Sequence, residues 1–220
     1  MTKEELTKKC ADIFLEEGVK ISTDELARLL VMSKRTLYTL FDSKEEIITA
    51  CFKYILQQQI ALFDQYHSQM KSNAIYMILP VSSVKLNQEM NKLNRFLREV
   101  KKYHPDIYRQ LMERHHLQMR DKVQEIILQG QKEGLFNTQL NAQLMAAILT
   151  MSHKETIDTI VMQDYSAEDV FYTSIVIWIK GMCTPKGIDI LNEAIAQEGE
   201  TIIQDINTYI IYKKNELYKK

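Results

Sequence analysis

Apolar residues recur every three or four positions along most of the chain, which is the period of an α-helix. Near the N-terminus, Leu6, Cys10, Ile13 and Phe14 form one such stripe. Runs that alternate apolar and polar residues, as half-buried strands do, are missing. With three prolines and six glycines in 220 residues, the chain carries few helix breakers. The sequence therefore predicts an all-α protein.

The first part of the chain predicts three short helices joined by tight connections. Gly18 follows the first stripe as a natural C-cap. Ser22 opens the second helix, and Glu25 completes a capping box. Ser33 is a good N-cap for the third helix, and Ser43 with Glu46 forms a second capping box that opens a fourth. Helices this short are marginal alone, so they must pack against their neighbours as a helix-turn-helix head over residues 1–49.

The third helix directs its polar residues outward while Leu37, Leu40 and Phe41 face inward. Lys34 and Arg35 stand at its N-terminal end, where the helix dipole disfavours positive charge. One interpretation is an ordinary solvated surface. The position of this pair at the start of the second helix of a helix-turn-helix favours contact with DNA instead.

The residue types on this face suit a DNA groove. Arg and Lys reach guanine edges, Thr contacts a thymine methyl or a phosphate, and a Tyr hydroxyl holds a phosphate. A lysine at the start of the fourth helix adds a phosphate contact beside the free amides there. The predicted DNA-contacting residues are Ser33, Lys34, Arg35, Thr36, Tyr38, Thr39 and Lys44.

The head carries a family resemblance over about the first fifty residues, because several fixed spacings agree at once. The matching residues are Leu26-Ala27, Met32-Ser33, Thr36-Leu37-Tyr38, Phe41 and Ser43-Lys44-Glu45-Glu46-Ile47. This string resembles the TetR family of bacterial transcriptional regulators. The resemblance implies a dimeric repressor or activator with an all-helical ligand-binding body.

Two features depart from the family pattern. Val31 occupies the turn position where the family usually has Gly, and a β-branched residue disfavours positive φ. The basic arm before the first helix is nearly absent, because Lys3, Lys8 and Lys9 are balanced by nearby acids. The resulting prediction is weak, salt-sensitive binding to unselected DNA.

The rest of the chain, residues 50–220, predicts a larger helical bundle for effector binding and dimerisation. Its expected helices extend to about Met70, from 74 to 89 with a kink at Pro80, over 91–103, and from Asp106 to Gly130 or Gly134. Further helices are expected over 140–161 and 170–179, and then after 185–187 with an interruption at Gly199.

The helices over 140–161 and 170–179 are apolar almost all round, which indicates burial on more than one side. We therefore predict that they form a four-helix interface between two copies of the chain. The last helical stretch, with its near seven-residue apolar repeat, is the alternative interface helix.

Methionine and aromatic residues in the body could line an adaptable pocket for a small apolar or amphipathic ligand. At helical spacing the same residues also fill ordinary cores. The candidate pocket residues are Met77, Phe96, Tyr108, Met112, His115, Met119, Met151 and His153.

Composition and charge limit the classes of function that the chain could have. The net charge of −1 does not by itself indicate a nucleic-acid-binding protein. Three distant cysteines favour reduced thiols in a cytoplasmic protein, and no apolar run is long enough for a membrane span. No phosphate-binding glycine loop, metal-binding His spacing or nucleophile motif occurs, so we expect no enzyme, metal or cofactor.

The sequence thus predicts a transcriptional repressor that binds a palindromic double-stranded DNA operator as a homodimer and is released by a ligand. The alternative is a helical protein-interaction module that keeps the shape of the head with little DNA affinity. The nearly neutral head and Val31 motivate that alternative.

Overall fold

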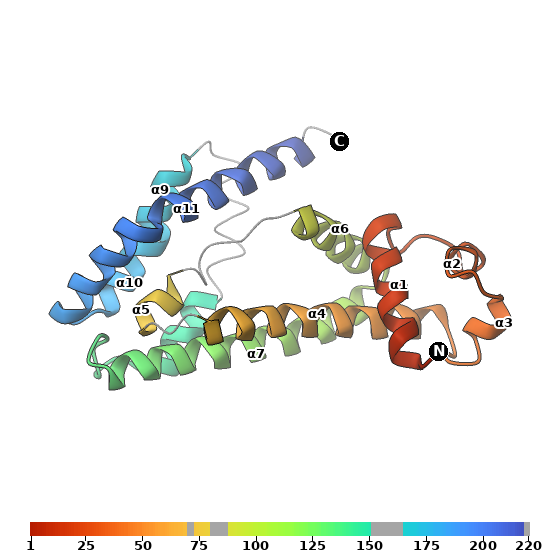
Figure 1. Ribbon diagram of the computed structural model, residues 1–220, viewed down its shortest axis with the longest axis horizontal. Coiled ribbons are helices and arrows are strands. Elements are labelled where there is room, and N and C mark those ends of the chain that lie inside the picture. The colour runs from red at the N-terminus through yellow and green to blue at the C-terminus, as the bar shows by residue number, and fades with distance from the viewer. Residues whose placement is uncertain (70–72, 80–87, 151–164, 218–220) are drawn as a thin grey trace. The chain divides into compact units, whose positions relative to one another are not determined.

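The computed structural model describes residues 1–69, 73–79, 88–150 and 165–217, and within them it is helical with no strand (Figure 1). The predicted all-α class is confirmed. The elements are α1 (Lys3–Glu17), α2 (Thr23–Leu29), α3 (Lys34–Leu37), α4 (Lys44–Gln69), α5 (Ala74–Ile78), α6 (Gln88–Tyr103), α7 (Pro105–Lys132), a helix over 142–150, α9 (Ala167–Phe171), the π-helix η2 (Tyr172–Val176), α10 (Ile177–Met182) and α11 (Pro185–Leu217). The predicted kink at Pro80, the end near Met70 and the stretch 151–161 lie outside the described residues.

The chain forms two compact units. The first contains Met1–Gln65 and Asn87–His115, and the second contains Tyr66–Leu86 and His116–Lys220. The predicted functional boundary after residue 49 stays a prediction, because it concerns which residues bind DNA rather than which residues pack together. Both α4 and α7 contribute residues to the two units.

The first unit has one continuous apolar core. Phe14 of α1, Leu26 of α2 and Leu37 of α3 are fully buried beside α4. The same core continues into α6 and α7 through Phe96, Val100 and Leu111. The three short helices are therefore stabilised by tertiary packing on α4 and α6, as their length requires.

An aromatic cluster joins α4, α6 and α7 inside this unit. The ring centroids of Phe52 and Phe96 lie 5.6 Å apart in an edge-on arrangement, and Phe52 stacks on Tyr108 at 6.2 Å. Both geometries are favoured for aromatic pairs. Phe52 is the member shared by the two contacts, and it is fully buried.

Polar contacts fasten α6 to the C-terminal end of α1, beside which it lies (Figure 1). The Arg95 guanidinium donates to the Leu15 carbonyl at 2.7 Å and also to the Glu16 carbonyl. The Glu99 carboxylate accepts the Val19 amide at 2.8 Å. These groups partner backbone atoms that the helix end and the following turn leave without intrahelical bonds.

Gly18 ends α1 as predicted, with φ +87°. A Cβ atom at this position would lie 2.5 Å from the Glu99 carboxylate. Positive φ and close approach therefore both favour glycine here.

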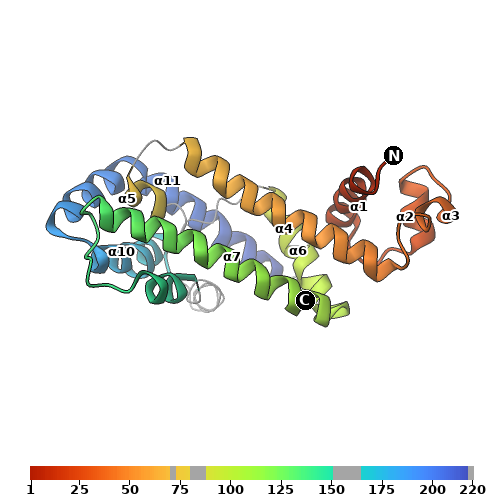
Figure 2. The same cartoon turned by 90° about the horizontal axis from the view of Figure 1, so that it is seen from below.

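In the second unit, α11 packs on α9 and α5 and runs without a break from Pro185 to Leu217 (Figure 2). The predicted interruption at Gly199 is wrong. One glycine costs a helix about 1 kcal/mol, whereas the buried stripe of Ile202, Ile206 and Ile210 stabilises the helix through packing. Pro185 fits because the first helical position needs no amide hydrogen.

Candidate nucleic-acid interface

The connection between α2 and α3 is a tight helix-ending motif. The Val31 amide donates to the Arg28 carbonyl at 3.1 Å, and the Met32 amide donates to the Ala27 carbonyl at 3.0 Å. These two bonds are the Schellman pattern, which requires a left-handed residue directly after the C-cap. Val31 fills that place with φ +55°. The turn thus keeps the geometry expected of glycine although a β-branched residue occupies it.

Replacing Val31 by glycine is expected to stabilise the protein by about 1 kcal/mol, because the left-handed conformation costs an L-residue about 1–2 kcal/mol and glycine almost nothing. The Val31 side chain is 92% exposed, so its removal loses little packing. Urea unfolding followed by circular dichroism measures the gain. Val31→Ala retains the Cβ atom and should gain less. A loss of stability in Val31→Gly would contradict this account.

α3 is a single turn that continues in tighter turns. The Ser33 hydroxyl accepts the Thr36 amide at 3.0 Å, which confirms Ser33 as the N-cap. Beyond Leu37, the Thr39 and Leu40 amides bond to carbonyls three residues back. Ser33 and Thr36 also bond to each other through their hydroxyls at 2.7 Å.

The outward side of α3 presents Arg35 and Tyr38 to solvent. Lys34 is also exposed, but its ammonium donates to the Asp24 carboxylate of α2 at 2.9 Å. That hydrogen bond is the main cause of a raised Lys34 pKa. The Thr39 hydroxyl donates to the Thr36 carbonyl at 2.6 Å. The cations and Tyr38 therefore face outward, whereas the hydroxyls of Ser33, Thr36 and Thr39 are bonded within the segment 33–39.

Lys44 is half-buried at the start of α4, and its ammonium donates to the Ile21 carbonyl at 2.6 Å. Burial lowers the Lys44 pKa. In this conformation Lys44 ties α4 to the chain between α1 and α2. A phosphate contact by Lys44 would require that bond to be exchanged for one to DNA.

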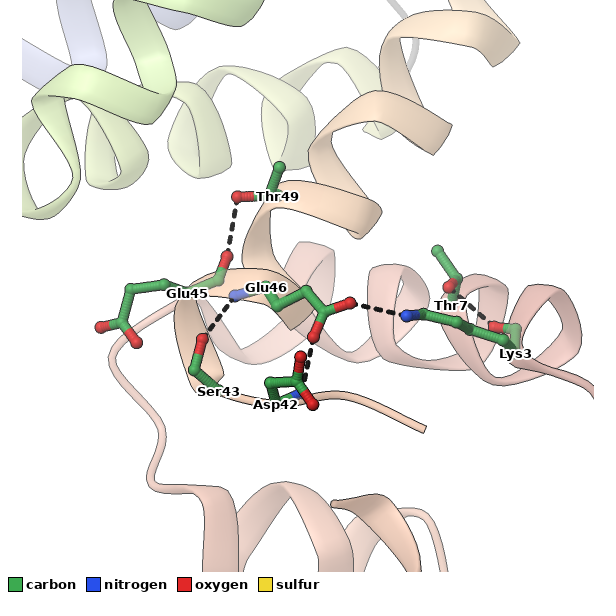
Figure 3. A network of polar contacts seen from close by, with 7 residues as sticks. All are labelled: Lys3, Thr7, Asp42, Ser43, Glu45, Glu46 and Thr49. Atoms are coloured by element: carbon green, nitrogen blue, oxygen red, sulfur yellow. Dashed lines mark hydrogen bonds and ion pairs between the residues drawn. The ribbon is translucent and has the colours of Figure 1, made fainter. Parts of the chain in front are cut away.

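Polar contacts around Glu46 fix the start of α4 against α1 (Figure 3). The Glu46 amide donates to the Ser43 hydroxyl at 3.1 Å, as a capping box requires. Its carboxylate, however, accepts the Asp42 amide at 2.5 Å and the Lys3 ammonium at 2.6 Å. The Lys3 and Asp42 contacts, in that order, lower the Glu46 pKa.

The two predicted capping boxes are therefore only half formed. At α2 the Ser22 hydroxyl accepts the Glu25 amide at 3.1 Å, but the Glu25 carboxylate pairs with Arg28 at 2.6 Å. At α4 the Glu46 carboxylate turns to Lys3. In each case a nearby cation attracts the carboxylate more strongly than the N-cap amide does.

The predicted pocket residues are divided between the two units, and the pocket stays a prediction. Phe96, Tyr108 and Met112 belong to the core of the first unit or pack on it. Met77 and Met119 are half-buried in the second unit, and His115 is the last residue of the first. Met151 and His153 lie outside the described residues. Phe96 is fully buried and contacts Phe52 in the aromatic cluster, so it fills part of the core of the first unit.

The sequence did not predict Asp24 as the partner of Lys34. Asp24 and Glu25 form an acidic pair in the first turn of α2, but acids are common there because they interact favourably with the helix dipole, so the pair did not indicate a contact with α3. Within the described residues, no helix is long and apolar enough to cross a membrane, and no group of three or more His, Cys, Asp or Glu could hold a metal ion.

Known proteins match this chain through their structures. No protein-family model matches it, and no curated protein matches it in sequence. A TetR-family transcriptional regulator from Cytophaga hutchinsonii aligns with a TM-score of 0.65 and 18% identity, over 83% of this chain and 94% of its own. A TetR transcription regulator from Haloarcula marismortui aligns with a TM-score of 0.64 and 19% identity, over 83% of this chain and 98% of its own.

A third match was solved with a ligand. The transcriptional regulator FadR from Bacillus subtilis, in complex with stearoyl-CoA, aligns with a TM-score of 0.58 and 18% identity, over 81% of this chain and 98% of its own. The sequence of the head resembles the TetR family over about fifty residues, and the fold resembles these regulators over most of the chain. The chain has the TetR-like fold that these transcriptional regulators share.

Proposed function

We propose that this chain is a DNA-binding transcriptional repressor that acts in the cytoplasm as a homodimer and is released by a small-molecule ligand. The observation that carries the proposal is the exposure of Arg35 on α3 and of Tyr38 at its C-cap, in the second helix of a helix-turn-helix within a TetR-like fold. α3 would enter the major groove of one half-site. Two heads would then read half-sites about 34–36 Å apart, one helical turn of DNA.

The second unit supports the homodimer with exposed apolar side chains on the helices predicted to form the interface. Leu144 in the helix over 142–150, Tyr172 in η2, and Ile177 and Trp178 in α10 are all exposed in the single chain. Contact with a partner would remove these apolar side chains from water. A second copy of this chain is the partner we propose, because a two-fold axis lets one face pair with itself.

The ligand part of the proposal draws support from FadR, which binds stearoyl-CoA in its own structure. In this chain we place a small apolar or amphipathic ligand in the body, near half-buried residues such as Met77 and Met119. Because α4 and α7 each belong to both units, a change in the second unit has a continuous helical connection to the first. A coupling free energy of about 1–3 kcal/mol would give useful switching.

Selection of bound fragments from a random duplex library, at low and moderate salt, tests the DNA-binding part. We expect a palindrome with two half-sites about one helical turn apart. Weak, sequence-blind binding that vanishes at moderate salt would instead support the protein-interaction module. The bonds that hold Lys34 and Lys44 within the head are the observation in favour of that second candidate.

Single substitutions separate the contacts that read bases from those that hold phosphates. Arg35→Ala should change the selected half-site and weaken binding to the wild-type operator by about 1–3 kcal/mol, because base contacts carry the sequence information. Tyr38→Phe should weaken binding to all sequences alike, because phosphate contacts carry none. Fluorescence anisotropy on matched and mismatched duplexes measures both. If neither variant alters binding, α3 is not the recognition helix.

A further inference from the structure

The contact between Asp24 and Lys34 lies on the surface that we propose meets DNA. Asp24 stands in the first turn of α2, which packs on α3, and its side chain is 72% exposed. The Lys34 ammonium, on the first residue of α3, lies 2.9 Å from the Asp24 carboxylate. The pair therefore connects the two helices of the helix-turn-helix through their solvent-facing side chains.

The ion pair between Asp24 and Lys34 is expected to contribute little to the stability of the fold. Exposed ion pairs contribute little to folding, and the start of α2 is already capped by Ser22 and carries Glu25 as a second acid. A DNA contact by Lys34, in contrast, requires its ammonium to leave the Asp24 carboxylate. The contact is therefore expected to affect DNA binding far more than folding.

DNA binding would be changed by Asp24 in two ways. Its charge repels phosphates, and Lys34 must leave it before contacting DNA. Binding to unselected DNA consists almost entirely of phosphate attraction, so both effects oppose it. At an operator, base contacts from α3 add free energy that offsets the same cost. A penalty against the wrong sequence is one of the two routes to specificity.

We propose that Asp24 is a specificity-determining residue, which lowers affinity for unselected DNA by holding Lys34 and by repelling phosphate. This inference rests on the proposed DNA-binding function. It differs from that function by assigning the role to an acidic residue on α2, outside the recognition helix.

The neighbouring residue provides a matched control. Glu25 carries the same charge on the same turn of α2, but it pairs with Arg28 of that helix at 2.6 Å rather than with α3. Asp24→Asn and Glu25→Gln therefore change the net charge equally. Only the first releases a cation of α3.

The experiment measures the affinity of the full chain for two duplexes of equal length over a series of salt concentrations. One duplex carries the sequence that the wild-type chain selects from the random library, and the other carries a mixed sequence. Asp24→Asn should bind the mixed duplex about fivefold more tightly at low salt, with a salt slope steeper by about one, since one more cation reaches a phosphate. Its affinity for the selected duplex should rise less, so the ratio of the two affinities should fall by about threefold.

Two further variants make the test specific to the pair. Glu25→Gln should leave the affinity ratio unchanged, within about twofold. Adding Asp24→Asn to a Lys34→Ala chain should no longer steepen the salt slope, because the released cation is absent. The inference would be overturned, while the proposed function stands, if Asp24→Asn had the same affinity ratio as the wild type. It would also be overturned if the affinity ratio fell as much in Glu25→Gln as in Asp24→Asn. A wild-type chain that selects no sequence would overturn the proposed function, and this inference with it.

Discussion

Replacing Phe52 by alanine is expected to lower the free energy of unfolding by about 3–5 kcal/mol, the range for removing a buried aromatic side chain. Phe52 is fully buried and contacts both Phe96 of α6 and Tyr108 of α7. Its loss would leave a cavity at the point where α4, α6 and α7 meet. Urea unfolding followed at 222 nm measures the change, and the melting temperature should fall by about 10 °C.

Leu62→Ala is the control for this prediction. Leu62 lies on the same helix, α4, but is 57% exposed. Its replacement should change the free energy of unfolding by about 0.5 kcal/mol or less, as is usual for surface positions. Equal losses in the two variants would show that the aromatic cluster does not form the core of the first unit.

Replacing Ile177 by glutamate is expected to weaken dimerisation by about 100-fold or more. Ile177 is 60% exposed in the single chain, on the α10 face that we propose meets a second copy. Burying an unpaired carboxylate costs several kcal/mol, and a two-fold interface contains the substitution twice. Sedimentation equilibrium should show a dimer for the wild type and a monomer for the variant. Affinity for the palindrome should fall as well, because the two heads are no longer joined.

Leu128→Glu supplies the matched control, because Leu128 is an exposed leucine of α7 outside the predicted interface. This variant should remain dimeric and should bind the palindrome like the wild type. A wild-type chain that is monomeric at micromolar concentration would contradict the homodimer. A dimeric Ile177→Glu chain would move the interface away from α10, with α11 as the alternative.

The fold was predictable because its main signals are local. The spacing of Leu6, Cys10 and Phe14 predicts the buried face of α1, and all three are buried. Gly18, Ser22 and Ser33 end or begin their helices as expected, since caps act within one turn. The π-helix η2 had no such signal, because it differs from an α-helix in hydrogen bonds that reach one residue further along the chain and not in composition.

The hydrogen-bond partners at the candidate site were less predictable than the helices, because they lie on other elements of the chain. Lys34 on α3 turns to Asp24 ten residues earlier, and Lys44 turns to the Ile21 carbonyl. A sequence pattern predicts which residues face outward. It does not predict which of several nearby oxygens an ammonium group approaches, since those alternatives differ little in free energy at an exposed surface.

The first unit has one buried core, which α1 to α4 share with α6 and the start of α7. This shared core limits how a chimeric regulator can be built. Exchanging residues 1–49 for those of a relative would replace part of the buried core to which Phe96 and Val100 also belong. Cores close-packed in this way tolerate few mismatches in volume. A transplant that keeps its own packing must therefore carry Met1–Gln65 together with Asn87–His115, two separate segments of one chain.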